Sequence, residues 1–187
     1  MEGTLCRAVR AKYLRRTPPQ PLYYGGSEIG ARYTPRGGPA GLYLASDPAT
    51  ALAEIRDLMQ SPRGQLLPSA RRDPVTLVYV ETEVGRVLDL TDATIRRALR
   101  IGRKAIMAEW HEPMLAYLAG KGPMPLTQQI GVAAHISGIV GGILFPSVRW
   151  KGGLCLVVFP DRLAKGDRVA SYDPEGVLAQ VLMPPAP

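Results

Sequence analysis

Hydrophobic and polar positions alternate in short runs along the chain and predict seven strands. In these runs β-branched, aromatic and aliphatic residues predominate, and glycine, proline or aspartate stands close to the ends, which is typical of strands in a sheet. The predicted strands cover residues 5–9, 41–45, 75–81, 86–90, 142–145, 154–159 and 177–183.

Helices are predicted where a capping residue precedes an apolar pattern with a helical period. Asp47 stands before Pro48, whose fixed φ suits the first helical position. Thr91 and Asp92 precede a second such segment, and Thr127 precedes a third. The sequence therefore predicts helices that begin after each of these three positions.

A fourth helix is predicted over residues 103–119, with Pro113 breaking or kinking it. Strands and helices do not alternate as a doubly wound sheet requires, and the glycine-rich residues 150–153 between two apolar runs predict a hairpin. We therefore expect an α+β fold, with a mixed, largely antiparallel sheet and flanking helices in one domain over residues 1–187.

Composition points to a globular protein of the cytoplasm. Hydrophobic residues make up 46% and charged residues 21% of the chain, and no apolar run has the length of a membrane-spanning helix. Cys6 and Cys155 are too few for a disulfide framework or a zinc site, which favours a reducing compartment and no metal. The net charge of +7 suggests an acidic partner, a nucleic acid or an anionic small molecule, or simply a solvated basic surface.

Four polar side chains stand out between residues 30 and 54. Arg32 and Tyr33 lie between glycines, where the backbone can approach a ligand closely, and together they could hold a phosphate and a ring. Tyr43 lies on the opposite strand face from its neighbours, and Glu54 lies at the margin of an apolar helix face that includes Ala51, Leu52 and Ile55. Each also has an ordinary interpretation: a surface pair for Arg32 and Tyr33, core packing for Tyr43 and a solvated boundary residue for Glu54.

Ser147 stands at the end of a predicted strand, a common place for binding residues. No G-x-S-x-G motif surrounds it, and neither His111 nor His135 has flanking signals of a catalytic base, so a serine hydrolase is disfavoured. The sequence also lacks a dinucleotide-binding glycine motif, a P-loop, an HExxH motif and paired cysteines.

Taken together and in order, these segments resemble the RES-domain family of bacterial toxins, named for an arginine, a glutamate and a serine. The matching segments are GARYTPRGGPAGLYLASDPATALAE, with Arg32 and Glu54, and GGILFPSVRWKGGLCLVVF, with Ser147. The resemblance covers a core of about residues 7–161 and leaves a proline-rich tail at 183–187.

The resemblance implies a fold similar to ADP-ribosyltransferases and an enzyme that binds NAD as a substrate and cleaves its nicotinamide–ribose bond. Glu54 would stabilise the oxocarbenium-like ribose, and Arg32 would pair with the pyrophosphate or hold the nicotinamide ribose. Tyr33 and Tyr43 would bind the nicotinamide end, and Ser147 would hydrogen-bond the substrate. Water, inorganic phosphate or a side chain of a target protein could accept the ADP-ribose, so NAD depletion and protein ADP-ribosylation both remain open.

The family also implies a cognate Xre-type helix-turn-helix antitoxin that covers the cleft and itself makes the DNA contacts. A rival hypothesis is a non-catalytic basic module that binds nucleic acid, because one predicted helical segment is rich in cations. These cations are Arg96, Arg97, Arg100, Arg103 and Lys104.

Overall fold

The computed structural model describes residues 1–24, 30–59 and 74–185, and its centre is a mixed sheet of eight strands in the order β4-β5-β6-β2-β1-β3-β7-β8. The strand bounds are β1 Glu2–Arg10, β2 Leu42–Ala45, β3 Val75–Glu83, β4 Val87–Asp89, β5 Gly142–Pro146, β6 Leu154–Val158, β7 Arg168–Ser171 and β8 Val181–Leu182. Every pairing between these strands is antiparallel except that of β4 with β5. The predicted α+β fold with a largely antiparallel sheet is confirmed.

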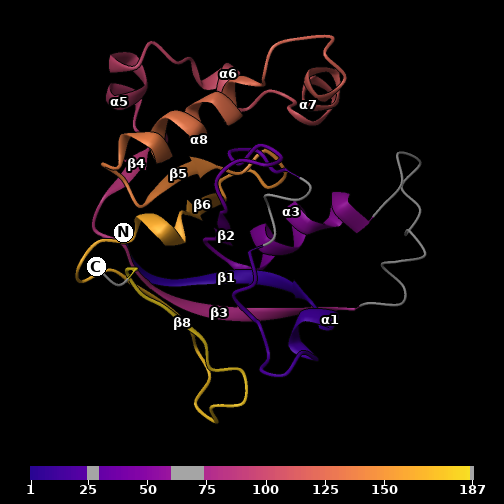
Figure 1. The fold of residues 1–187 in the computed structure, drawn as a ribbon, viewed down its shortest axis with the longest axis vertical. Coiled ribbons are helices and arrows are strands. Elements are labelled where there is room, and N and C mark those ends of the chain that lie inside the picture. Colours follow the sequence, from indigo (N-terminus) through magenta and orange to yellow (C-terminus); the bar gives the residue numbers. More distant parts are fainter. Residues whose placement is uncertain (25–29, 60–73, 186–187) are drawn as a thin grey trace.

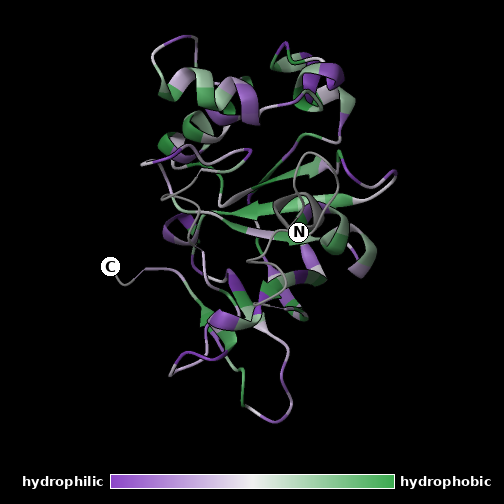
Figure 2. Ribbon diagram, turned by 90° about the vertical axis from the view of Figure 1, so that its right-hand side faces the viewer, coloured by the Kyte–Doolittle hydropathy of each residue, from purple (hydrophilic) through white to green (hydrophobic). Residues whose placement is uncertain are grey.

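Helices gather mainly at one end of the sheet, beyond β4 and β5, while α3 lies beside β1 and β2 (Figure 1). Their bounds are α1 Ala11–Leu14, α3 Pro48–Met59, α5 Ala93–Ala98, α6 Arg103–Ile106, α7 His111–Leu118 and α8 Leu126–Ser137, with a 3-10 turn, η1, at Pro160–Arg162. Apolar residues concentrate in the strands at the middle of the molecule (Figure 2). None of the helices in the described ranges is long and apolar enough to cross a bilayer.

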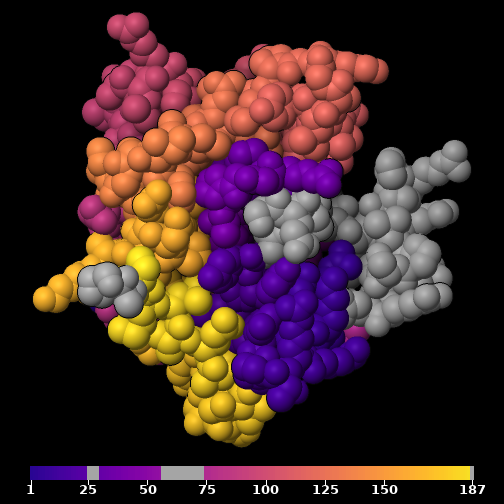
Figure 3. Space-filling model, viewed as in Figure 1, coloured from indigo at the N-terminus to yellow at the C-terminus, as the bar shows by residue number. Residues whose placement is uncertain are grey.

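The core has two main parts, which lie on opposite faces of the sheet, because alternate residues of β2 and β6 belong to one cluster or the other. One cluster surrounds β1 and β3 and includes Leu5, Val80 and Leu156, and the other lies under α8 and includes Tyr33, Phe145 and Phe159. A smaller cluster of Cys6, Ala45 and Ala51 seats α3 on β1 and β2. The first and last parts of the described chain adjoin on one face (Figure 3), where the Leu22 amide donates to the Gln180 side chain.

Six of the predicted strands are confirmed, with ends that move by a few residues, and the seventh shrinks to the two residues of β8. The short strand β7 was not predicted, because its four residues follow a charged turn and carry no clear alternation. The hairpin predicted around residues 150–153 is confirmed as the antiparallel pair β5–β6.

Two helix predictions are corrected. The segment 103–119 forms α6 and α7 rather than one helix, and the break precedes Pro113, which occupies the first turn of α7, where a missing N–H costs little. The Glu109 carboxylate starts α7 instead, by accepting bonds from the His111 and Glu112 amides. Thr127 is not a cap, because α8 begins one residue earlier and Thr127 is buried.

The cation-rich segment also divides, into α5 and α6, so it does not present the single helix face that the nucleic-acid hypothesis assumed. Arg96 turns back to donate to the carbonyls of Leu90 and Thr91, at 2.7 Å each, and Arg97 bonds to the carbonyl of Ala93.

Candidate active site

The turn between β2 and α3 fixes the position of Glu54. Asp47 caps α3: its Oδ1 accepts from the Thr50 amide at 2.9 Å, and its Oδ2 accepts from the hydroxyls of Thr50, at 2.6 Å, and Ser46, at 2.8 Å. These bonds lower the pKa of Asp47. The capped helix α3 therefore places Glu54 about two turns after Asp47. Glu54 lies beside Ala51, whose side chain packs on β1 and β2. Leu52, which the pattern placed on the apolar face, is exposed.

The β5–β6 loop lies directly against this helix because position 153 has no side chain. A Cβ on Gly153 would come within 2.2 Å of the Thr50 hydroxyl oxygen. The Ser46 hydroxyl accepts from the Leu154 amide at 3.1 Å, and the Ser46 amide donates to the Leu154 carbonyl at 2.9 Å. The loop that carries Ser147 is thereby fastened to the start of α3.

Ser147 and Glu54 meet in a short hydrogen bond. The Ser147 hydroxyl donates to Oε1 of Glu54 at 2.5 Å, across 93 positions of sequence. The Oγ of Ser147 accepts in turn from the amides of Arg149, at 3.1 Å, and Trp150, at 3.0 Å. Since both amides donate to Oγ, the hydroxyl proton is directed to the carboxylate, and Ser147 orients Glu54.

Arg32 is buried close by, with 7% of its surface exposed. Its Nη1 donates to the carbonyls of Ile106, at 3.1 Å, and Ala108, at 3.0 Å, which ties the loop before β2 to the end of α6. Burial lowers the pKa of the Arg32 guanidinium, while the nearby charge of Glu54 raises it. Arg32 and Glu54 are thus an opposite-charge pair within electrostatic reach of each other.

Tyr33 and Tyr43 support the Arg32 loop. Tyr33 is fully buried, and its ring packs on Phe145 with centroids 4.6 Å apart. The Tyr43 hydroxyl accepts from the Tyr33 amide at 2.9 Å and pairs with the Thr34 hydroxyl at 3.1 Å. Burial raises the pKa of Tyr43 to about 12, against the effect of these bonds. The structure brings both tyrosines to the site, but it places the Tyr33 ring in the core, which favours a supporting role over direct stacking.

Cys155 lies beside Glu54, a contact that no sequence pattern predicts. Its thiol is buried on β6, and burial raises its pKa, as does the Glu54 carboxylate beside it. The thiol therefore stays protonated at neutral pH and presents a weak donor to Glu54. No short motif marks such a contact, because it depends on the register of β6 with β2.

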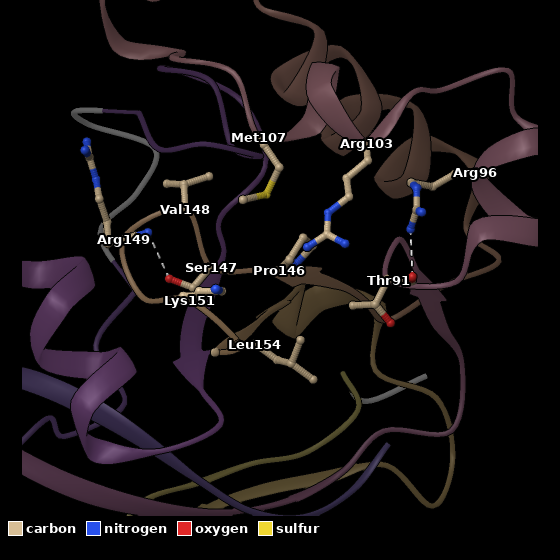
Figure 4. Close-up of a pocket in the computed structure, with 12 residues that line it drawn as sticks. Thr91, Arg96, Arg103, Met107, Pro146, Ser147, Val148, Arg149, Lys151 and Leu154 are labelled. Atoms are coloured by element: carbon tan, nitrogen blue, oxygen red, sulfur yellow. Dashed lines mark hydrogen bonds between the residues drawn. The ribbon is translucent and has the colours of Figure 1, made fainter.

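A pocket of about 560 Å³ opens on the Ser147 side of the Ser147–Glu54 pair (Figure 4). Its apolar walls include Met107, Val148 and Leu154, and four of its lining residues are cationic. These are Arg96, Arg103, Arg149 and Lys151. In the sequence, Arg96 and Arg103 suggested only a nucleic-acid surface, and nothing marked Lys151. The three side chains line one pocket because α5 and α6 pack near the β5–β6 hairpin.

The histidines lie in different surroundings from Ser147. His135 is on α8, 2.7 Å from Asp161 and edge-on to Phe159, and His111 begins α7. Within the described ranges, no group of three or more His, Cys, Asp or Glu side chains could hold a metal ion. The site so described is a partly buried carboxylate, a buried serine that orients it, a buried arginine and a basic pocket.

Comparisons with known proteins bear on the fold and the family of the chain. The sequence comparison with curated proteins gives no match. Among solved structures, the MbcT toxin in the M. tuberculosis MbcT–MbcA toxin–antitoxin complex matches with a TM-score of 0.64 at 20% identity, over 98% of this chain and 86% of that one. The model of the RES domain matches residues 4–179, beyond the expected core of 7–161 at both ends. By this match over nearly its whole length, the chain belongs to the RES-domain family.

Proposed function

We propose that this protein is the toxin of a toxin–antitoxin pair and that it arrests growth by cleaving the nicotinamide–ribose bond of NAD. The observation that carries the proposal is the 2.5 Å bond from Ser147 to Glu54 at the edge of a basic pocket. Departure of nicotinamide leaves positive charge on the ribose, and a carboxylate that is held in place and partly shielded from solvent stabilises that charge. The position of Glu54 supports this role.

In this proposal Arg32 acts together with Glu54. Its buried positive charge attracts the Glu54 carboxylate, and its bonds to Ile106 and Ala108 hold one wall of the site in place. Tyr33 and Tyr43 hold the Arg32 loop at the nicotinamide end of the substrate. The fold would then serve NAD binding as it does in ADP-ribosyltransferases.

A partner follows from the same proposal. The related MbcT fold is known from a complex of a toxin with its antitoxin. We expect a cognate antitoxin of the Xre helix-turn-helix type to cover the pocket, with acidic groups facing the four cations that line it.

The purified chain should consume NAD and release nicotinamide without added metal. Incubation with NAD alone, with inorganic phosphate and with cell lysate, followed by mass spectrometry, distinguishes the three possible acceptors. Free ADP-ribose identifies hydrolysis, ADP-ribose phosphate identifies phosphorolysis, and a labelled protein identifies ADP-ribosylation of a target. Unchanged NAD under all three conditions, with a folded and antitoxin-free protein, would contradict the proposal.

Ser147→Ala should lower kcat by about 10- to 100-fold and leave KM for NAD nearly unchanged, because one hydrogen bond to a charged group is lost. The matched control is Ser137→Ala, which removes a hydroxyl bonded to a carbonyl on α8. Steady-state kinetics on both variants test the role. A rise in KM at constant kcat would instead mean that Ser147 binds the substrate directly.

A further inference from the structure

The pocket beside Ser147 concentrates positive charge that the Glu54 chemistry does not use. Among the described residues that line it, four are cationic and none is acidic. Arg96 is already engaged with two backbone carbonyls. The side chains of Arg103 and Lys151, by contrast, have neither a hydrogen bond nor an ion pair with any of the described residues.

We propose that Arg103 and Lys151 form a subsite for phosphoryl oxygens next to the Ser147–Glu54 pair. Arg103 begins α6 and extends toward the β5–β6 loop, and Lys151 belongs to that loop, so the two cations approach from different elements (Figure 4). Cations of like charge that share a concave site repel one another, and a bound anion removes that repulsion.

The two side chains suit this ligand in different ways. The planar fork of arginine can give two parallel bonds to a phosphoryl group, and lysine adds a mobile point charge. A pocket of about 560 Å³ also has the size of a small-molecule site, and its apolar residues Met107, Val148 and Leu154 can contact a ring attached to the phosphate. A basic surface for a nucleic-acid backbone would need neither the depth nor the apolar walls.

Two sources could supply the phosphoryl group, and here the inference rests on the proposed function. One is the pyrophosphate of NAD, which would fix the dinucleotide so that its ribose reaches Glu54. The other is free inorganic phosphate, which would be held next to the developing oxocarbenium ion as its acceptor. Both sources present the same phosphoryl oxygens to the two cations. They differ in whether removal of the two cations changes KM for NAD or the ratio of phosphorolysis to hydrolysis.

The test is the double variant Arg103→Gln with Lys151→Gln, against the matched control Lys104→Gln with Lys165→Gln. The control residues are exposed, lie outside the pocket lining and give the same change of net charge. Calorimetry measures binding of inorganic pyrophosphate and inorganic phosphate to each full-length protein. Kinetics then compare NAD with nicotinamide riboside, which has no pyrophosphate.

The pocket variant should bind pyrophosphate at least about tenfold more weakly than the control. If NAD supplies the phosphate, KM for NAD rises by a similar factor while the slower turnover of nicotinamide riboside is unchanged. If free phosphate is the ligand, KM for NAD stays constant and the ratio of phosphorolysis to hydrolysis falls. Either pattern supports the subsite.

Pyrophosphate and phosphate affinities equal to those of the control, together with equal NAD kinetics, would overturn the subsite and leave the proposed function intact. If the wild-type chain never consumed NAD but bound pyrophosphate more tightly than the pocket variant does, the subsite would stand and the proposed function would be overturned. The binding arm therefore separates a failure of the subsite from a failure of the chemistry.

Discussion

Glu54→Gln should reduce NAD turnover at least about a hundredfold and abolish growth arrest in cells that express the chain. The amide keeps the size of the side chain and can still accept the Ser147 hydroxyl bond of 2.5 Å, but it carries no negative charge to stabilise the ribose cation. The loss should therefore fall on kcat, with KM for NAD little changed. Nicotinamide release, measured directly on the purified variant, is the appropriate assay.

The control is Glu83→Gln, which makes the same change of charge at an exposed residue at the end of β3, a strand that β2 and β1 separate from β6 in the sheet. It should keep wild-type kinetics. If a folded Glu54→Gln protein consumed NAD at the wild-type rate, Glu54 would have no role in the reaction, and the site would have to lie elsewhere.

Gly131→Ala should lower the free energy of unfolding much more than Gly122→Ala does. A Cβ at position 131 would lie 1.7 Å from the carbonyl oxygen of Tyr33, so α8 or the segment before β2 would have to move. Overpacking typically lowers the free energy of unfolding by about 1–3 kcal/mol, and a clash with backbone should reach at least the upper end of that range. The higher helix propensity of alanine raises the free energy of unfolding again by about 1 kcal/mol. The net loss should be about 2 kcal/mol, or roughly 4–8 °C in Tm.

Thermal unfolding of Gly131→Ala and of the control Gly122→Ala checks this expectation. At position 122 the added methyl would meet only the Ala116 Cβ, at an ordinary 3.8 Å, and Tm should change little. Equal Tm values for the two variants would show that α8 can shift without cost. NAD turnover should also fall in Gly131→Ala, because α8 holds the Arg32 loop through the bond from Gln128 to the Ala31 carbonyl.

The parts of the fold that were predictable from the sequence are those with strong local signals. Asp47 and Asp92 mark helix starts because their side chains bond to nearby amides, and the structure has both bonds. Most strands were recognised from their alternation. Thr127 misled because a threonine near a helix start can equally be a buried residue of the first turn. The break between α6 and α7 depends on the Glu109 bonds, for which the sequence offers no distinctive pattern.

The site was predictable only in part, for a related reason. The pattern placed Glu54 at the margin of a helix face, and the family resemblance joined it to Arg32 and Ser147, but no local rule states which atoms meet. Strand register and helix packing determine the remaining contacts. They make Ser147 a donor to Glu54, bring the Cys155 thiol beside the same carboxylate and gather the cations around the pocket. Such contacts join distant segments, and they become visible only in three dimensions.

The order of the strands also determines when the site can exist during synthesis. Strand β2, which leads into the helix of Glu54, must pair with β6, and Ser147 lies in the loop between β5 and β6, 93 positions after Glu54. At a translation rate of about 5–20 residues per second, roughly 5–20 s pass between the incorporation of these two residues. A nascent chain on the ribosome therefore cannot carry out the proposed reaction until β6 has emerged and paired with β2.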